Sequence, residues 1–94
     1  MRIAGIVWLE EIVEKLAQKH GVKQDEVRQV LANLPRFRFL EKGHRLGENV
    51  YSATGQTDAG RYLIIVFVYK RDHRALILST RDMTDSERRR HGKK

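Results

Sequence analysis

Hydrophobic residues in the N-terminal third of the chain recur at helical spacing. Residues 3–8 first read as a short apolar strand, and from Glu10 the apolar positions lie three or four residues apart. Gly21 supplies the left-handed turn that ends such a helix. A second helix follows, and Pro35 ends it because proline forces the residue before it out of helical geometry. The apolar stripe of this second helix consists of Val27, Val30, Leu31 and Leu34.

After Pro35 the hydrophobic period changes from that of a helix to that of a strand. Phe37 and Phe39 alternate with arginines, which predicts a half-buried strand that runs to about Glu41. Three further strands, separated by polar loops and turns, are predicted over residues 49–56, 61–70 and 74–81. Since consecutive strands joined by short turns pair in antiparallel fashion, this part of the chain predicts an antiparallel meander.

The strand predicted over residues 61–70 is apolar at every position from Tyr62 to Tyr69. In an antiparallel sheet with one solvent-exposed face, hydrophobic and polar residues alternate along each strand. This strand does not alternate, so both of its faces must be covered. The two helices can cover one face. A C-terminal helix, or another chain, must cover part of the other, and the capping box of Thr84 and Glu87 predicts a short helix that starts at Asp85.

These elements define an α+β fold: an N-terminal strand, two short helices, a four-stranded antiparallel meander and a short C-terminal helix. No repeat or linker divides the 94 residues, so we predict a single domain over residues 1–94, with a basic tail that frays from about residue 91. No apolar run approaches the roughly 20 residues that span a bilayer. The N-terminus shows no signal-peptide pattern, and the chain has no cysteine, which fits a reducing compartment. We expect a cytoplasmic protein without membrane association.

The net charge of the chain indicates which classes of partner it attracts. Nineteen Lys and Arg against 12 Asp and Glu give a formal net charge of +7 at pH 7. Such an excess favours polyanions, acidic proteins or anionic membrane surfaces by long-range attraction, and it does not choose among them. Part of the excess lies in the last seven residues, where a solvated tail is the alternative to a binding one.

Three short motifs follow one another along the chain. The first closes the first helix, the second opens the most apolar strand, and the third joins the last strand to its capped helix. They are Lys19-His20-Gly21-Val22, Gly55 with Gly60-Arg61, and Ser79-Thr80-Arg81-Asp82-Met83-Thr84 with Glu87-Arg88. In order and spacing, from about residue 7 to residue 90, they resemble the BrnT-type toxins of bacterial type II toxin–antitoxin pairs.

The resemblance implies a compact fold like that of the RelE ribonucleases and a metal-independent endoribonuclease activity. It also implies two partners: RNA, and a cognate antitoxin with a ribbon–helix–helix DNA-binding domain that neutralises the toxin. A dimer, or a hetero-tetramer with the antitoxin, is compatible with this expectation, and no cofactor is expected.

Metal-free cleavage of RNA needs a base for the 2′-hydroxyl, cations for the phosphorane and an acid for the leaving oxygen. Arginine suits the cationic role because its planar fork meets two phosphate oxygens at once. We expect Arg61 and Arg81 to contact the phosphate, since both lie at or near strand ends where adjacent strands could gather them with Arg74. The alternative for each is a solvated or ion-paired surface arginine.

Two residues are candidates for proton transfer. Histidine is the usual side chain for this work near neutral pH, and His20 is one candidate, although at a helix C-terminus it could instead cap the last carbonyls. Glu48, at the start of its strand, is an alternative base.

Further candidates for RNA binding are Lys70, Arg74, Tyr69 and Arg88. The four histidines and scattered carboxylates show no i, i+4 metal pair, so no metal site is predicted.

One departure from the family pattern bears on activity. The third strand of the family commonly reads Glu-x-Arg-Phe, whereas here Val50 takes the position of the arginine between Glu48 and Tyr51. If that arginine contacts the scissile phosphate in relatives, catalysis by this chain is altered or lost. The alternative function is therefore a non-catalytic module of the same fold that binds RNA or a protein. A third option is a scaffold domain whose charge only keeps it soluble.

Overall fold

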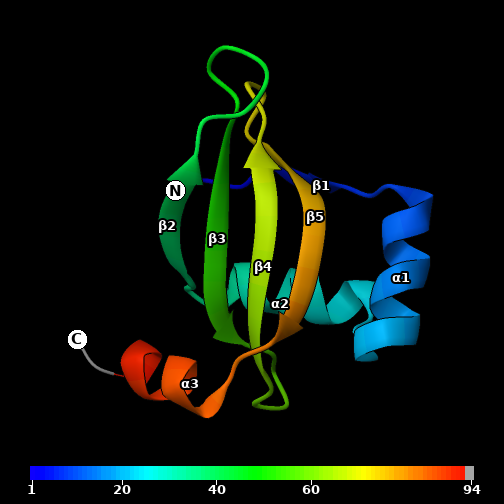
Figure 1. The fold of residues 1–94 in the computed structure, drawn as a ribbon, viewed down its shortest axis with the longest axis vertical. Helices are drawn as coiled ribbons and strands as arrows, with labels where there is room; N and C mark the ends of the chain where they lie inside the picture. The colour runs from blue at the N-terminus through cyan, green and yellow to red at the C-terminus, as the bar shows by residue number, and fades with distance from the viewer. Residues whose placement is uncertain (93–94) are drawn as a thin grey trace.

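A computed structural model describes residues 1–92 and shows an α+β fold of five strands and three helices (Figure 1). The elements are, in chain order, β1 (Gly5–Val7), α1 (Glu10–His20), α2 (Gln24–Ala32), β2 (Arg36–Glu41), β3 (Asn49–Gln56), β4 (Tyr62–Tyr69), β5 (Arg74–Asp82) and α3 (Asp85–Gly92). The predicted order of elements and the predicted fold class are confirmed. None of the helices within the described residues is long and apolar enough to cross a membrane.

All five strands belong to one sheet with the order β1-β5-β4-β3-β2. Strands β2 to β5 form the predicted antiparallel meander, with Tyr51 opposite Phe67 in the β3–β4 pair. The short β1 adds to the edge of β5 in parallel, where Gly5 lies opposite Arg74. Local periodicity predicted β1 as a strand but not its partner, because a parallel pairing joins segments nearly 70 residues apart in the chain.

Each of the helices α1 and α2 is followed by a residue with a left-handed backbone conformation. Gly21 has φ 58°, and the N–H groups of Gly21 and Val22 donate to the last carbonyls of α1, as predicted for a glycine stop. The end of α2 corrects one prediction. Leu34 is not part of the apolar stripe: α2 ends at Ala32, Leu34 has φ 50°, and Leu34 is 93% exposed. Because Pro35 excludes a helical conformation at the residue before it, the chain leaves the helix early and turns Leu34 into solvent.

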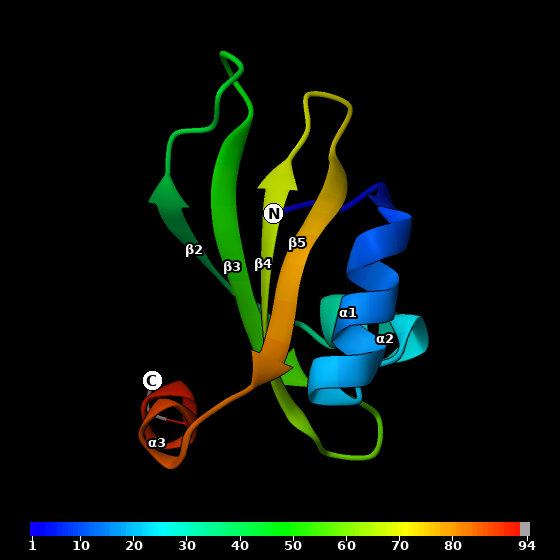
Figure 2. The same ribbon diagram turned by 45° about the vertical axis from the view of Figure 1, so that its right-hand side comes forward.

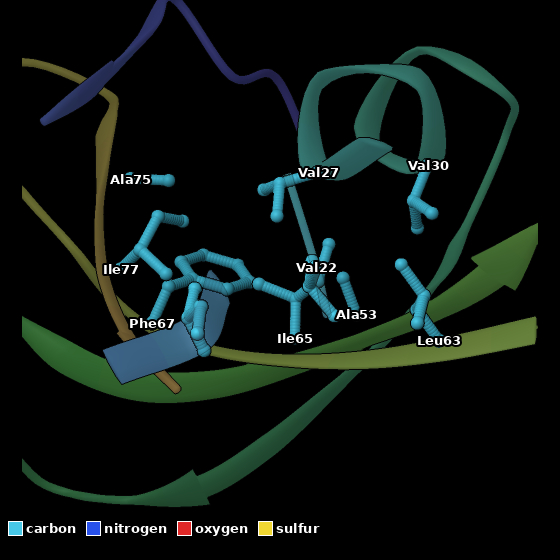
Figure 3. Packing of buried hydrophobic residues seen from close by; sticks show 10 residues of the cluster. Val22, Val27, Val30, Ala53, Leu63, Ile65, Phe67, Ala75 and Ile77 are labelled. Carbon is cyan, nitrogen blue, oxygen red and sulfur yellow. The ribbon is translucent and has the colours of Figure 1, made fainter. Parts of the chain in front are cut away.

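The core lies between the sheet and the pair α1–α2, which cover one face (Figure 2). Alternate residues of β4 point into it, and Leu63, Ile65 and Phe67 are fully buried. Val27 and Val30 of α2 pack against them from above in Figure 3. The residues between them on β4, such as Ile64 and Val66, are only partly covered, because they face the other side of the sheet.

Helix α3 lies on this second face, at the end of the sheet where β5 stops (Figure 2). It starts at Asp85 as predicted, and the capping box forms: the Thr84 N–H donates to Glu87 Oε1 at 2.8 Å, and the Glu87 N–H donates to Thr84 Oγ1 at 3.2 Å. No residue of α3 is buried, so most of the second face stays open. His91, where the basic tail was expected to begin, belongs to α3, and fraying of the tail stays a prediction. The rest of that tail, residues 93–94, lies outside the described residues.

Candidate functional site

A groove of about 570 Å³ occupies the open face of the sheet, between the β2 edge and α3. Its floor comes from the central strands and its walls from β2 and α3, so residues far apart in sequence meet in it. The lining residues are Arg36, Phe37, Arg38, Leu40, Ser52, Thr54, Ile64, Val66, Arg81, Glu87, Arg90 and His91. Four of these twelve are arginines and one is acidic, so the groove is strongly basic.

Strand alternation explains why these side chains face the groove. Ser52 and Thr54 on β3 lie between core-facing neighbours and point to the open face. Arg38 and Arg36 on β2 lie opposite Ser52 and Thr54 in the antiparallel pair, so they share the same face. Arg81 on β5 lies opposite Ile64 on β4, so these two side chains also share the open face. Arginines from both flanks of the sheet therefore border a floor of hydroxyl and aliphatic groups.

Arg81 is held in the groove by a two-pronged ion pair with α3. Its Nη1 and Nη2 atoms donate to Glu87 Oε1 and Oε2, both at 2.8 Å. The Arg81 guanidinium and the Thr84 N–H together lower the pKa of Glu87 to about 2. Glu87 in turn raises the pKa of Arg81. The predicted phosphate-binding residue Arg81 therefore lies in the groove, but it is already bound to a carboxylate.

His91 is the titratable group of the groove that the sequence analysis placed in the tail. Its Nδ1 lies 3.1 Å from the Thr54 hydroxyl oxygen, and its ring meets the Tyr62 ring edge-on at 6.1 Å between centroids. Burial, with a smaller contribution from the positive charge of Arg36, lowers its pKa. The capping box contained a signal for this position: four residues after Glu87, residue 91 falls on the same face of the helix.

Arg61 lies next to the start of β4 and forms the ion pairs that were the alternative to a phosphate contact, so its binding to RNA stays a prediction. It lies on the helix side of the sheet, where its guanidinium donates to Asp82 at 2.7 and 3.0 Å and to Glu26 at 3.3 Å. It also donates to the carbonyl oxygens of His20 at 2.7 Å and Gly21 at 2.9 Å. Asp82 is the main cause of its raised pKa. Arg61 thus ties the start of β4 and the end of β5 to the turn between α1 and α2.

Three more predicted residues lie at the opposite end of the sheet from α3, near the β4–β5 hairpin. Glu48 is buried, and it accepts hydrogen bonds from Lys70 Nζ and from the Arg71 N–H, both at 3.2 Å. The Arg71 bond is the main cause of its lowered pKa. The Tyr69 hydroxyl donates to the carbonyl oxygen of Arg2 at 2.5 Å, and the Tyr69 side chain packs against the core. These residues stabilise the hairpin end of the sheet.

The predicted gathering of Arg61, Arg74 and Arg81 does not occur. Arg74 and Arg81 lie at opposite ends of β5, and Arg61 lies on the other face from Arg81. Arg74 pairs with Asp72 in its own hairpin, at 2.7 Å. A position near a strand end does not say which end of the sheet or which face a residue reaches, and this is why the prediction failed.

The remaining predicted residues do not line the groove. The guanidinium of Arg88 lies over the Tyr62 ring, 4.4 Å from its centroid, and secures α3 to β4. The side chain of His20 is exposed at the end of α1, and only its carbonyl oxygen takes part in the Arg61 contacts. Val50, at the position where the family pattern has arginine, lies two residues before Ser52 and so on the groove face, where it is only 8% exposed.

No three His, Asp or Glu side chains of residues 1–92 come together as a metal-binding group. The expectation that the chain works without a metal stays a prediction.

Comparisons with known proteins agree with this fold. Residues 8–87 match the family described as the ribonuclease toxin BrnT of type II toxin–antitoxin systems. A similar solved structure is that of the Brucella abortus ribonuclease toxin BrnT, which superposes with a TM-score of 0.63 at 16% sequence identity. The match covers 86% of this chain and 97% of that chain. No curated protein sequence matches. Because the family match spans most of the chain, this protein belongs to the BrnT ribonuclease toxins of type II toxin–antitoxin systems.

Proposed function

We propose that the groove on the open face of the sheet is the site where this toxin binds and cleaves RNA. The observation that carries the proposal is the convergence of four arginines and one histidine of lowered pKa on one groove. The residues are Arg36, Arg38, Arg81, Arg90 and His91. Guanidinium groups on both sides of a groove can follow a phosphate backbone, and a histidine between them can move a proton.

The chemistry that these groups support is transfer of the phosphoryl group to the neighbouring 2′-oxygen. His91 accepts the 2′-hydroxyl proton as the bond from the 2′-oxygen to phosphorus forms and the bond from phosphorus to the 5′-oxygen breaks. A proton from solvent completes the leaving 5′-hydroxyl. Arg81 and Arg38 stabilise the extra negative charge on the phosphorane. The lowered pKa of His91 favours this role, because at neutral pH its imidazole is uncharged and can accept a proton.

Thr54 fits a positioning role for this base. If the Nδ1 atom of His91 carries its proton and donates it to the Thr54 hydroxyl, Nε2 is left with a free lone pair. The hydroxyl of Ser52, which lines the groove, can bond to a ribose hydroxyl or a base edge. Ile64 and Val66 provide an apolar floor against which a base can lie.

As a toxin of a type II system, the chain has an antitoxin partner. We further propose that this partner carries a ribbon–helix–helix domain and that the toxin acts in the cytoplasm, where its RNA substrate is found. The formal charge of +7 supports long-range attraction of RNA and of an acidic antitoxin segment alike.

One observation favours a second candidate function, binding of RNA without cleavage. Val50 is buried on the groove face at the position of the family's arginine, so the cation expected there is replaced by an aliphatic group. If that arginine is the one that stabilises the phosphorane, the groove retains phosphate binding and loses catalysis.

The test is incubation of the purified chain with a labelled mixed-sequence RNA in EDTA. Three variants run beside it: Arg38→Ala, His91→Ala and, as a structural comparison, Arg61→Met. Cleavage that is lost with His91→Ala, while that variant still binds RNA, supports the proposed site. RNA that is bound but stays intact with the unaltered chain favours the second candidate. Cleavage that survives both Arg38→Ala and His91→Ala refutes the proposed site.

A further inference from the structure

We infer that Glu87 is a built-in competitor for the RNA phosphate at Arg81, so that RNA enters the groove by exchanging a phosphate for this carboxylate. The inference rests on the proposed function of the groove. It assigns to Glu87 a specific role, which is to set how strongly the groove holds an anion.

The geometry of the pair is that of a phosphate contact. Both terminal nitrogens of Arg81 donate to the two carboxylate oxygens of Glu87 at 2.8 Å. An arginine fork meets a phosphodiester with the same parallel pair of hydrogen bonds, so carboxylate and phosphate compete for the same donors. Glu87 is the only acidic residue among the described residues that line the groove. The carboxylate thus occupies the position that a phosphate oxygen pair would take.

The exchange does not require α3 to unfold. Glu87 Oε1 also accepts the Thr84 N–H at 2.8 Å, so the carboxylate keeps its capping bond when Arg81 turns to another anion. The side chains of Arg81 and Glu87 are 47% and 22% exposed, and α3 buries none of its residues. The Arg81 guanidinium exchanges one anion for another and is not left without a partner, so a phosphate with further contacts to Arg36 or Arg38 can replace the carboxylate.

A purely structural role for the pair makes the opposite prediction. In that case Glu87 tethers α3 to β5 and keeps His91 over Thr54. Loss of the carboxylate would then loosen the helix, withdraw part of the groove wall and weaken the binding of RNA.

The two roles separate in one binding experiment. The probe is a fluorescent 2′-O-methyl oligouridylate, which cannot be cleaved because the attacking oxygen is blocked, and the readout is anisotropy at fixed salt. The test variant is Glu87→Gln, whose amide oxygen can still accept the Thr84 N–H. The matched control is Asp85→Asn, which removes the same charge from the first turn of the same helix, at a site that does not line the groove.

We expect Glu87→Gln to bind the probe about two- to five-fold more tightly than Asp85→Asn, the range that corresponds to an exposed ion pair. Affinity equal to that of Asp85→Asn, or weaker, overturns the inference. Glu87→Asp serves as a second test if Glu87→Gln fails to fold: it keeps the charge but is one methylene shorter, and it too should bind more tightly than the unaltered chain.

Arg81→Ala and Arg38→Ala distinguish failure of this inference from failure of the proposed function. If both weaken binding while Glu87→Gln behaves like Asp85→Asn, the groove binds RNA and only the role of Glu87 is wrong. If neither weakens binding, the groove is not the RNA site, and both proposals fall.

Discussion

The imidazole Nδ1 of His91 lies 3.1 Å from the hydroxyl oxygen of Thr54, which joins the last helix to the third strand of the sheet. The bond connects residues 37 positions apart in the chain. It fixes one ring nitrogen of His91 on β3, so in the proposed mechanism the other ring nitrogen is the one that accepts the proton.

Replacement of Thr54 by valine tests this relationship. The change keeps the shape of the side chain and removes the hydrogen bond to His91. We expect kcat for RNA cleavage to fall about five- to ten-fold, as for loss of one hydrogen bond that orients a base, with little change in KM. Single-turnover cleavage and probe binding measure the two effects separately. An unchanged kcat would mean that the Thr54 hydroxyl does not position the base.

The pH dependence of cleavage follows from the lowered pKa of His91. A protonated imidazole cannot accept the 2′-hydroxyl proton, so activity should fall as the pH drops through the pKa of His91. Because burial and Arg36 lower that pKa, the acid limb of the kcat profile should lie below the ordinary histidine value of 6.5. Arg36→Gln should move this limb towards higher pH, since it removes one of the two causes. A limb at or above pH 6.5 for the unaltered chain would argue against His91 as the base.

Loss of Arg61 should act on stability rather than on the chemistry of cleavage. Arg61→Met removes hydrogen bonds to Asp82, Glu26 and two carbonyl groups while keeping an aliphatic stem. We expect the free energy of unfolding in urea to fall by about 2–3 kcal/mol, the range for hydrogen bonds to charged groups. Binding of the oligouridylate probe below the urea transition should be unchanged. A stable variant that no longer binds RNA would instead restore Arg61 as a phosphate contact.

The ion pair of Arg81 and Glu87 should make stability depend on pH in the acid range. The pKa of Glu87 is about 2 in the folded chain against an ordinary value of 4.5. A carboxyl group whose pKa is lower in the folded chain than in the unfolded chain stabilises the fold at pH values above its unfolded pKa. This stabilisation is lost as the pH falls from about 4.5 through about 2. Thermal unfolding of Arg81→Ala should therefore show a smaller drop of Tm over this range than the unaltered chain. Parallel curves for the two proteins would show that the pair does not stabilise the fold.

Leu34 and Leu63 offer a matched comparison of exposed and buried leucines. Leu34 is 93% exposed with φ 50°, so Leu34→Gly relieves an unfavourable conformation and should leave the chain at least as stable. Leu63 is fully buried, so Leu63→Ala should lower the free energy of unfolding by about 2–5 kcal/mol. Urea denaturation of both variants measures the difference. A marked loss of stability in Leu34→Gly would show that Leu34 packs against something in solution.

Local sequence patterns were sufficient to predict the elements of this fold. Alternation of Phe37 and Phe39 predicted β2, the Gly21 turn separated α1 from α2, and the capping box of Thr84 and Glu87 placed the start of α3 at Asp85. Each signal depends on residues within a few positions of one another, because helix stops, caps and strand periods arise from local backbone geometry. The motifs that resemble the BrnT toxins are carried by the same segments, so the family too could be predicted from sequence.

The groove, by contrast, depends on which strands lie side by side and on where α3 packs. Arg38 and Arg81 come from the two flanks of the meander, and sheet register alone puts both on the open face. Arg61, like Arg81, is an arginine near a strand end. It lies on the helix side of the sheet, however, and there it pairs with the carboxylates of Glu26 and Asp82. His91 enters the groove only because α3 folds back over Thr54. Such contacts join distant segments, so the sequence by itself determined the elements and the family, whereas the tertiary structure decided which charged residues meet in the groove.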